Sequence, residues 1–252
     1  MLIDTHCHLY TFEEEVSEVL TRANEANVNR TICIGAGHGL ESADLAIRLA
    51  DNYQQVFATV GIHPHDAKEG ISISALENHL FNEKVIAVGE TGLDFFRDWS
   101  PKNEQERVFR ETISVAKKIK KPLIIHCRDA FDDTLRILKE ENASDVGGVF
   151  HCFAGDYAFA KKIFDLNFIV SFPGNVTFKK ATNIQETAKA MPLDKFMLET
   201  DAPYMAPEPY RGGKSEPMHV KTVAEFIAKL KNIDFSEVAE NTTKNAESLF
   251  SI

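Results

Sequence analysis

Six histidines and acidic residues follow short apolar runs, and all six are side-chain types that bind divalent metal ions. They are His6, His8, Glu90, His126, His151 and Asp201. A carboxylate that is buried without a cation or another partner is costly, whereas a pair of histidines by itself is equally well explained as hydrogen-bonded core residues. Together the six exceed the three or four protein ligands of one catalytic zinc. They therefore predict two divalent ions that share a bridging carboxylate.

The closest pair, His6 and His8, stands at the end of the first apolar run. Successive side chains of a strand point to opposite faces, so the two imidazoles are expected to share one face while Cys7 points to the other. The same alternation predicts that Cys127 and Cys152, each of which follows a candidate ligand histidine, point toward packed helices. We interpret these three cysteines as small core residues rather than as ligands.

The candidate ligands need elements that bring distant strand ends together. Short β-rich apolar runs recur eight times, and stretches with helical periodicity separate most of them. The predicted strands are 2–6, 30–34, 56–62, 85–89, 122–126, 148–151, 168–171 and 195–198, and the predicted helices are 13–26, 40–52, 103–119, 131–139, 157–166, 184–190 and 217–230. Because the candidate ligands follow many strands rather than one switch point, this alternation favours a single (β/α)8 TIM barrel over residues 1–252. The alternative is a doubly wound open sheet.

Composition limits the possible partners. The chain has 252 residues with 28 Lys plus Arg against 38 Asp plus Glu, a formal net charge of -10, which argues against sequence-independent coating of nucleic acid. Any phosphate binding must therefore be local. Four cysteines without a CxxC pair indicate a reducing compartment. Because neither a cationic leader nor a long apolar run is present, we expect a cytoplasmic protein without a membrane span, and no feature indicates an obligatory protein partner.

Several motifs resemble those of the TatD-type metal-dependent hydrolases and deoxyribonucleases, a family of amidohydrolase-like barrels. The motifs are IDTHCHL at 3–9, GIHPH at 61–65, GETGLD at 89–94, IHCR at 125–128, HCF at 151–153, LETDAPY at 198–204 and the arginine loop at 210–212. The resemblance implies that His6, His8 and Asp201 bind one metal ion. It implies further that His126 and His151 bind the second ion and that Glu90 bridges the two. A departure from the family pattern is Phe95-Phe96 after Asp94, where many relatives have a tyrosine.

The reaction implied by the resemblance is hydrolysis of a DNA phosphodiester bond, from a 3′ end or at a damaged position. A water activated between two ions of zinc, manganese or magnesium would be the nucleophile. Asp201 is the candidate general base, and Glu90 is the second catalytic residue. Two alternatives stay open. One is hydrolysis of another ester or amide, such as a D-aminoacyl-tRNA, and the other is a non-catalytic barrel that serves as a binding protein. Neither the ligands nor the fold separates the first from DNA cleavage, whereas the second would be marked by a lost ligand, and all six ligands are present.

Four further polar residues are predicted to contact the substrate. His63, before a proline at the end of a predicted strand, is placed to touch a phosphate, and the resemblance supports that role. Arg211 and Arg128 could clamp a phosphate through the guanidinium fork. Asp94, expected in a loop after the fourth strand, would orient either a substrate group or a ligand histidine. His65 is a weaker candidate than His63 for the same contact.

Overall fold

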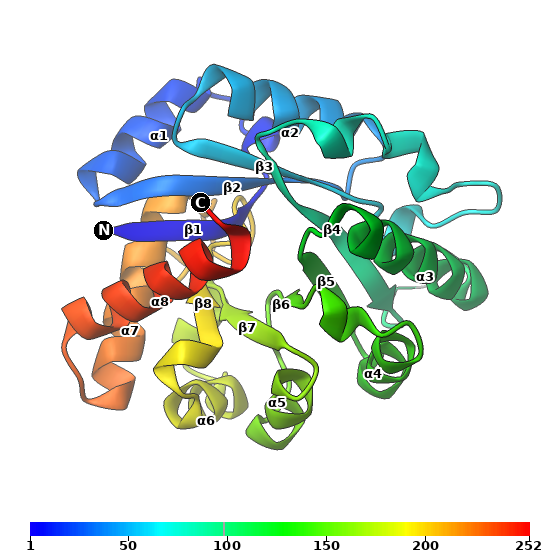
Figure 1. Ribbon diagram of the computed structural model, residues 1–252. Coiled ribbons are helices and arrows are strands. Elements are labelled where there is room, and N and C mark those ends of the chain that lie inside the picture. The colour runs from blue at the N-terminus through cyan, green and yellow to red at the C-terminus, as the bar shows by residue number, and fades with distance from the viewer. Residues whose placement is uncertain (98) are drawn as a thin grey trace. The chain divides into compact units, whose positions relative to one another are not determined.

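The structure is a computed structural model that describes residues 1–97 and 99–252. Within these residues, eight strands alternate with α-helices (Figure 1). The strands are β1 (Leu2–Cys7), β2 (Val28–Gly35), β3 (Val56–Val60), β4 (Val85–Asp94), β5 (Leu123–Arg128), β6 (Gly148–Phe150), β7 (Phe168–Phe172) and β8 (Phe196–Leu198). The α-helices are α1 (Val16–Glu25), α2 (Glu41–Asn52), α3 (Lys102–Ile119), α4 (Phe131–Glu140), α5 (Tyr157–Phe164), α6 (Thr182–Ala190), α7 (Val220–Lys231) and α8 (Phe235–Phe250).

The strands follow one another in the sheet in chain order, from β1 to β8. The pairs β1–β2, β3–β4, β4–β5, β5–β6 and β7–β8 are parallel. Parallel pairing of consecutive strands requires a crossover after each strand. Just after β8, Ala202 forms a parallel bridge with Cys7 at the end of β1. This is the topology of a (β/α)8 barrel, so the predicted fold class is confirmed.

The chain divides into two compact units. The first comprises Met1–Cys33, Cys152–Lys161 and Ile169–Ile252, and the second comprises Ile34–His151 and Lys162–Phe168. In the first unit, α8 packs against β1, β8 and α7. This last helix was not predicted. Its buried face consists mainly of small side chains such as Ala239, Thr242 and Ala246, so few large apolar residues mark this helix in the sequence.

In the second unit, β4 is the longest strand, and all ten of its residues are buried. It runs five residues past the predicted end, so Asp94 ends a strand rather than lying in a loop. The extension depends on glycine: a Cβ atom on Gly92 would lie 2.1 Å from His126 O on β5. Without a side chain there, the two backbones approach closely enough to pair up to Asp94 and Arg128.

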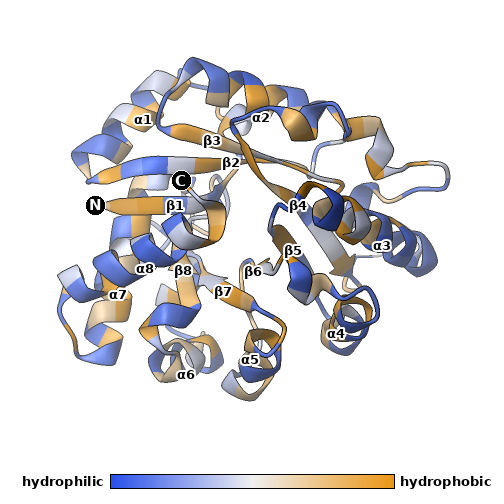
Figure 2. Ribbon diagram, in the orientation of Figure 1, coloured by the Kyte–Doolittle hydropathy of each residue, from blue (hydrophilic) through white to orange (hydrophobic). Residues whose placement is uncertain are grey.

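Hydropathy differs between strands and helices (Figure 2). The strands are largely apolar, whereas the helices alternate apolar and polar residues, as helices with one face on a core do. In α3 the buried residues Val108, Thr112 and Ala116 recur every four positions. In the part of the chain that the structure describes, no helix is both long and apolar enough to cross a membrane.

Candidate metal centre

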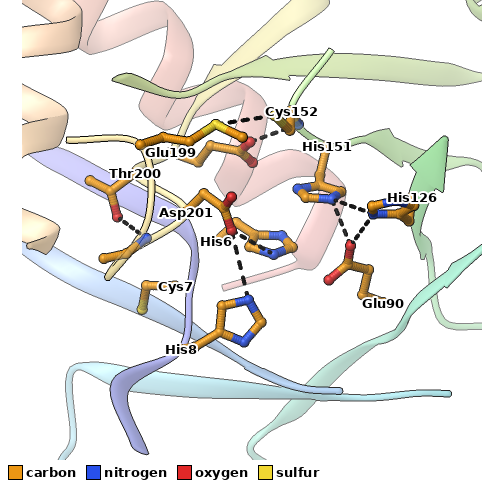
Figure 3. A network of polar contacts seen from close by, with 12 residues as sticks. His6, Cys7, His8, Glu90, His126, His151, Cys152, Glu199, Thr200 and Asp201 are labelled. Carbon is orange, nitrogen blue, oxygen red and sulfur yellow. Dashed lines mark hydrogen bonds and ion pairs between the residues drawn. The ribbon is translucent and has the colours of Figure 1, made fainter. Parts of the chain in front are cut away.

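Asp201 and two histidines of the first unit form one candidate ligand cluster (Figure 3). Asp201 Oδ1 lies 3.8 Å from His6 Nε2 and 3.7 Å from His8 Nε2, and all three residues are buried. These distances are beyond hydrogen-bond range. Two ligands that each lie about 2.1 Å from one tetrahedral zinc are about 3.4 Å apart, so the spacing and the mixed nitrogen and oxygen donors suit a shared divalent ion.

The ends of β1 and β8 hold this cluster in place. Asp201 N donates to His6 O at 2.9 Å. Before it, Thr200 is fixed by the buried Asp4, whose Oδ1 accepts from Thr200 N at 2.9 Å and whose Oδ2 accepts from Thr200 Oγ1 at 2.6 Å. Burial raises the pKa of Asp4 well above its usual range, although the Thr200 hydrogen bonds oppose that shift. Asp4, for which no role was predicted, thus positions the segment that carries Asp201.

Glu199 is a second acidic residue of this region for which no role was predicted. Its side chain is buried, Oε1 accepts from Cys152 N at 2.7 Å, and Oε2 accepts from Ser171 Oγ at 2.6 Å. The sequence does hint at such a role, since an acidic side chain directly after the apolar strand β8 needs polar partners. Glu199 therefore links the end of β8 to Cys152, which follows β6, and to Ser171 in β7.

Glu90 and two histidines of the second unit form the other candidate ligand cluster (Figure 3). Glu90 Oε1 lies 2.7 Å from His126 Nδ1 and 2.7 Å from His151 Nε2, and these two nitrogens are 3.3 Å apart. Burial opposes ionisation of Glu90, but the charges and hydrogen bonds of His151, His63 and His126 outweigh it, so the pKa of Glu90 lies well below its ordinary value. The cluster thus presents an ionised carboxylate and two imidazoles, which are donors suited to a divalent ion.

Asp94 holds His126 from the opposite side of the ring. Its Oδ2 lies 3.1 Å from His126 Nε2 and 2.7 Å from His65 Nε2. Burial would raise the pKa of Asp94, but hydrogen bonds from His126, His65 and Arg97 N hold it far below its ordinary value. A carboxylate behind a ligand histidine fixes the orientation of the ring. The contacts favour the orienting role among the two predicted for Asp94, and they bring His65 into the site.

His63 lies beside this cluster, and its contacts indicate which of its ring nitrogens carries the proton. One ligand atom each of His63, Glu90 and His126 lie within 4.8 Å of one another, but His63 Nδ1 accepts from His65 N at 3.1 Å. Burial lowers the pKa of His63 to about 4, so its ring is neutral at pH 7 and the proton is on Nε2. That nitrogen lies 3.5 Å from Glu90 Oε1. His63 therefore offers a hydrogen-bond donor, which fits contact with a phosphate better than ligation of a metal.

The cysteines beside the histidines behave differently from one another. Cys7 Sγ lies 3.5 Å from Ile32 O of β2, and Cys127 Sγ lies 3.4 Å from Thr134 Oγ1 of α4. Cys152 was predicted to point toward packed helices, and this was wrong. Cys152 lies past the end of β6 and has a φ angle of 47°. Its Sγ is 3.5 Å from Met205 Sδ in the loop after β8. Strand alternation does not extend to a residue in a left-handed conformation.

Both predicted phosphate-binding arginines are exposed and stack on aromatic rings. The Arg128 guanidinium, at the end of β5, lies 3.8 Å from the centroid of the Phe96 ring. The Arg211 guanidinium, in the long loop after β8, lies 4.1 Å from the centroid of the Phe178 ring. Stacking leaves the edge of the guanidinium fork available for bidentate contacts.

Comparison with known proteins identifies the family. The model of the TatD-related DNase family matches residues 3–251. The chain belongs to this family. It is 43% identical to YabD of Bacillus subtilis, described as an uncharacterised metal-dependent hydrolase, over 100% of both chains. The crystal structure of YjjV, a TatD homologue from Escherichia coli K12, matches with a TM-score of 0.91 at 30% identity and covers 100% of this chain and 98% of that one.

The predicted resemblance to TatD-type hydrolases is therefore confirmed, and the chain is a metal-dependent hydrolase of the TatD family. One relative has a more specific name. It is the 3′-5′ ssDNA/RNA exonuclease TatD of Klebsiella pneumoniae, which is 30% identical over 96% of this chain and 94% of its own length.

Proposed function

We propose that this TatD-family protein is a deoxyribonuclease that hydrolyses DNA phosphodiester bonds with two divalent ions, from a 3′ end or at a damaged position. The observation that carries the proposal is the compact cluster of Glu90, His126 and His151, with nitrogen-to-oxygen distances of 2.7 Å, together with the separate cluster around Asp201. The exonuclease name of the Klebsiella relative supports a nucleic-acid substrate.

The two clusters would divide the ligands between two ions of zinc, manganese or magnesium. His6, His8 and Asp201 would hold the first ion, and the histidines at the ends of β5 and β6 would hold the second. Glu90 would provide its carboxylate to both. Ions held in this way supply Lewis acidity toward a phosphodiester and lower the pKa of water toward neutrality.

The remaining side chains would move one proton and hold the substrate. The Asp201 carboxylate would accept the proton of the attacking water. It is the acidic residue of the first cluster, and it faces two imidazoles. His63 Nε2–H would donate to a non-bridging phosphate oxygen. Arg128 and Arg211 would bind neighbouring phosphates through their guanidinium groups.

The proposal is tested by incubating metal-reconstituted protein with a panel of labelled substrates. The panel contains single-stranded DNA with free or blocked 3′ ends, duplex DNA with an abasic position, RNA and D-aminoacyl-tRNA. We expect DNA to be cleaved fastest, and Glu90→Gln, which keeps the side-chain shape and removes its charge, to be inactive on every DNA substrate. Preferential hydrolysis of the aminoacyl ester would instead assign the protein to another ester hydrolase, and no turnover with any metal or substrate would leave a binding barrel.

A further inference from the structure

The loop after β4 exposes two large aromatic side chains. Phe96 is 56% exposed and Trp99 is 62% exposed, although large apolar groups on a protein surface are usually covered. Both lie in the second unit, a few residues after Asp94. The other strongly exposed aromatic residue of this unit, Phe81, precedes the start of β4 and so belongs to the opposite end of that strand.

Arginines surround the two exposed aromatic rings. The Arg128 guanidinium lies 3.8 Å from the Phe96 centroid, and the Arg97 guanidinium lies 5.1 Å from the Trp99 centroid. Three other arginines of this unit, Arg107, Arg110 and Arg136, are instead paired with carboxylates. A chain with a formal net charge of -10 thus gathers cationic and aromatic groups at one place.

Hydrogen bonds hold Phe96, Arg97 and Ser100 of this loop in place. Asp94 Oδ1 accepts from Phe96 N at 3.0 Å and from Arg97 N at 2.9 Å. Gln105 of α3 donates to Asp94 O at 3.1 Å and to Ser100 O at 2.9 Å. A loop that is ordered before binding loses less conformational entropy when a ligand arrives.

The loop is continuous with the Glu90 cluster. The Trp99 ring lies 4.4 Å from the His65 ring, His65 Nε2 lies 2.7 Å from Asp94 Oδ2, and that oxygen lies 3.1 Å from His126 Nε2. A ligand on the aromatic rings would therefore be a short distance from the histidine that contacts Glu90.

We propose that Phe96 and Trp99, together with Arg97 and Arg128, form a platform on which unpaired bases of single-stranded nucleic acid stack next to the Glu90 cluster. The inference rests on the proposed nuclease function and specifies where on this protein the bases of a single strand would bind. Aromatic rings bind any base through its π face, and guanidinium groups bind phosphates and also stack, so this composition fits a strand of arbitrary sequence. Bases inside a duplex already stack on their neighbours and present no free face.

Trp99 makes the proposal directly measurable, because it is the single tryptophan of the chain. Metal-loaded protein would be titrated with hydrolysis-resistant phosphorothioate oligonucleotides while tryptophan fluorescence is recorded. The ligands are a single strand with bases, an abasic strand with the same number of phosphates, and a hairpin duplex with closed ends. We expect saturable quenching by the strand with bases, and about tenfold weaker binding of both other ligands, since neither offers an unpaired base that can stack on the rings.

Two variants separate stacking from general surface effects. Phe96→Ala is expected to weaken binding of the strand with bases about tenfold and to leave the affinity for the abasic strand nearly unchanged, because only the stacked base is lost. Phe81→Ala removes an aromatic ring that is 70% exposed, from a position before β4, and should bind both strands as the unmodified protein does. Fluorescence anisotropy of labelled strands gives the affinity of each variant independently of Trp99.

Binding and cleavage measurements together separate the aromatic platform from the nuclease reaction. Equal affinity for the abasic strand and the strand with bases, with DNA still cleaved, would overturn the platform and keep the nuclease. Quenching and base-dependent binding without any cleavage would keep the platform and remove the nuclease reaction. Absence of oligonucleotide binding in both the unmodified protein and Phe96→Ala would overturn the platform and would leave the exposed rings to a protein partner.

Discussion

Asp94→Asn is the substitution that most directly tests how this site is built. The carboxylate is fully buried. One of its oxygens contacts the His126 ring, and the other accepts a hydrogen bond from Phe96 N in the loop after β4. Asparagine has the same shape and no charge. The variant should therefore fold with the same backbone while it loses the contacts that only a carboxylate can make.

The magnitude follows from the four donors around Asp94. Oδ1 accepts from two backbone N–H groups at 3.0 and 2.9 Å, and Oδ2 faces the Nε2 atoms of His65 and His126 at 2.7 and 3.1 Å. An asparagine keeps one acceptor oxygen and turns an NH2 group toward the other two donors. Two hydrogen bonds to a charged acceptor are lost, at about 1.5 kcal/mol each, so the free energy of unfolding of the metal-free protein should fall by about 3 kcal/mol.

The same change should weaken metal binding at the Glu90 cluster. Loss of the group that orients a ligand histidine typically lowers metal affinity or activity by about 10–100-fold. Urea unfolding of the metal-free protein gives the stability change, and titration of the apoprotein with zinc or manganese gives the affinity. A variant that keeps full affinity for both ions, and whose unfolding free energy stays within about 0.5 kcal/mol of the unmodified protein, would refute the role of Asp94.

The stability difference should also depend on pH. The pKa of Asp94 in the folded protein lies well below its ordinary value of 3.8. The stability it contributes is thus fully present above the unfolded-state pKa and is lost as the pH falls through the folded-state pKa. The gap between the metal-free protein and Asp94→Asn should narrow below about pH 4. As a matched control, Asp44→Asn removes an exposed carboxylate 2.8 Å from His79 Nε2 and should cost less than about 0.5 kcal/mol at every pH.

Three further substitutions test other parts of the site. Glu90→Gln should lose turnover and at least one metal ion, as measured by elemental analysis, because a charge that faces two imidazoles is removed. Its circular dichroism should be unchanged. Two retained ions with near-native activity would contradict this. Cys127→Ala should lower the free energy of unfolding by about 1 kcal/mol and leave metal content intact, since the thiol faces Thr134; a lost ion would place a thiolate in the site. Arg211→Ala should weaken DNA binding alike for every sequence and flatten the log-log salt dependence by no more than about 0.7, which is one phosphate on a single strand. A salt slope of about -5 or steeper in the unmodified protein would reveal an extended basic track that this reasoning excludes.

The sequence alone determined the fold class and the residues around which the two clusters form. Both depend on local patterns: apolar runs separated by helical periodicity predict parallel strands with crossovers, and a polar residue directly after such a run must lie at the end of a strand. Helix α8 was not predicted because its buried face is built largely from Ala and Thr, which mark an apolar face less clearly than large side chains do. The family resemblance rested on the same strand-end motifs.

Only the tertiary structure decided which atoms meet. The pairing register shifts between Gly89 and Thr91 on β4, and a bulge of this kind changes where the Glu90 side chain points. The tautomer of His63 depends on a backbone N–H of the next turn, and the role of Asp94 depends on histidines that are 29 and 32 residues away in the chain. Such contacts are set by register, bulges and close backbone approach between strands, which no local period of the sequence records.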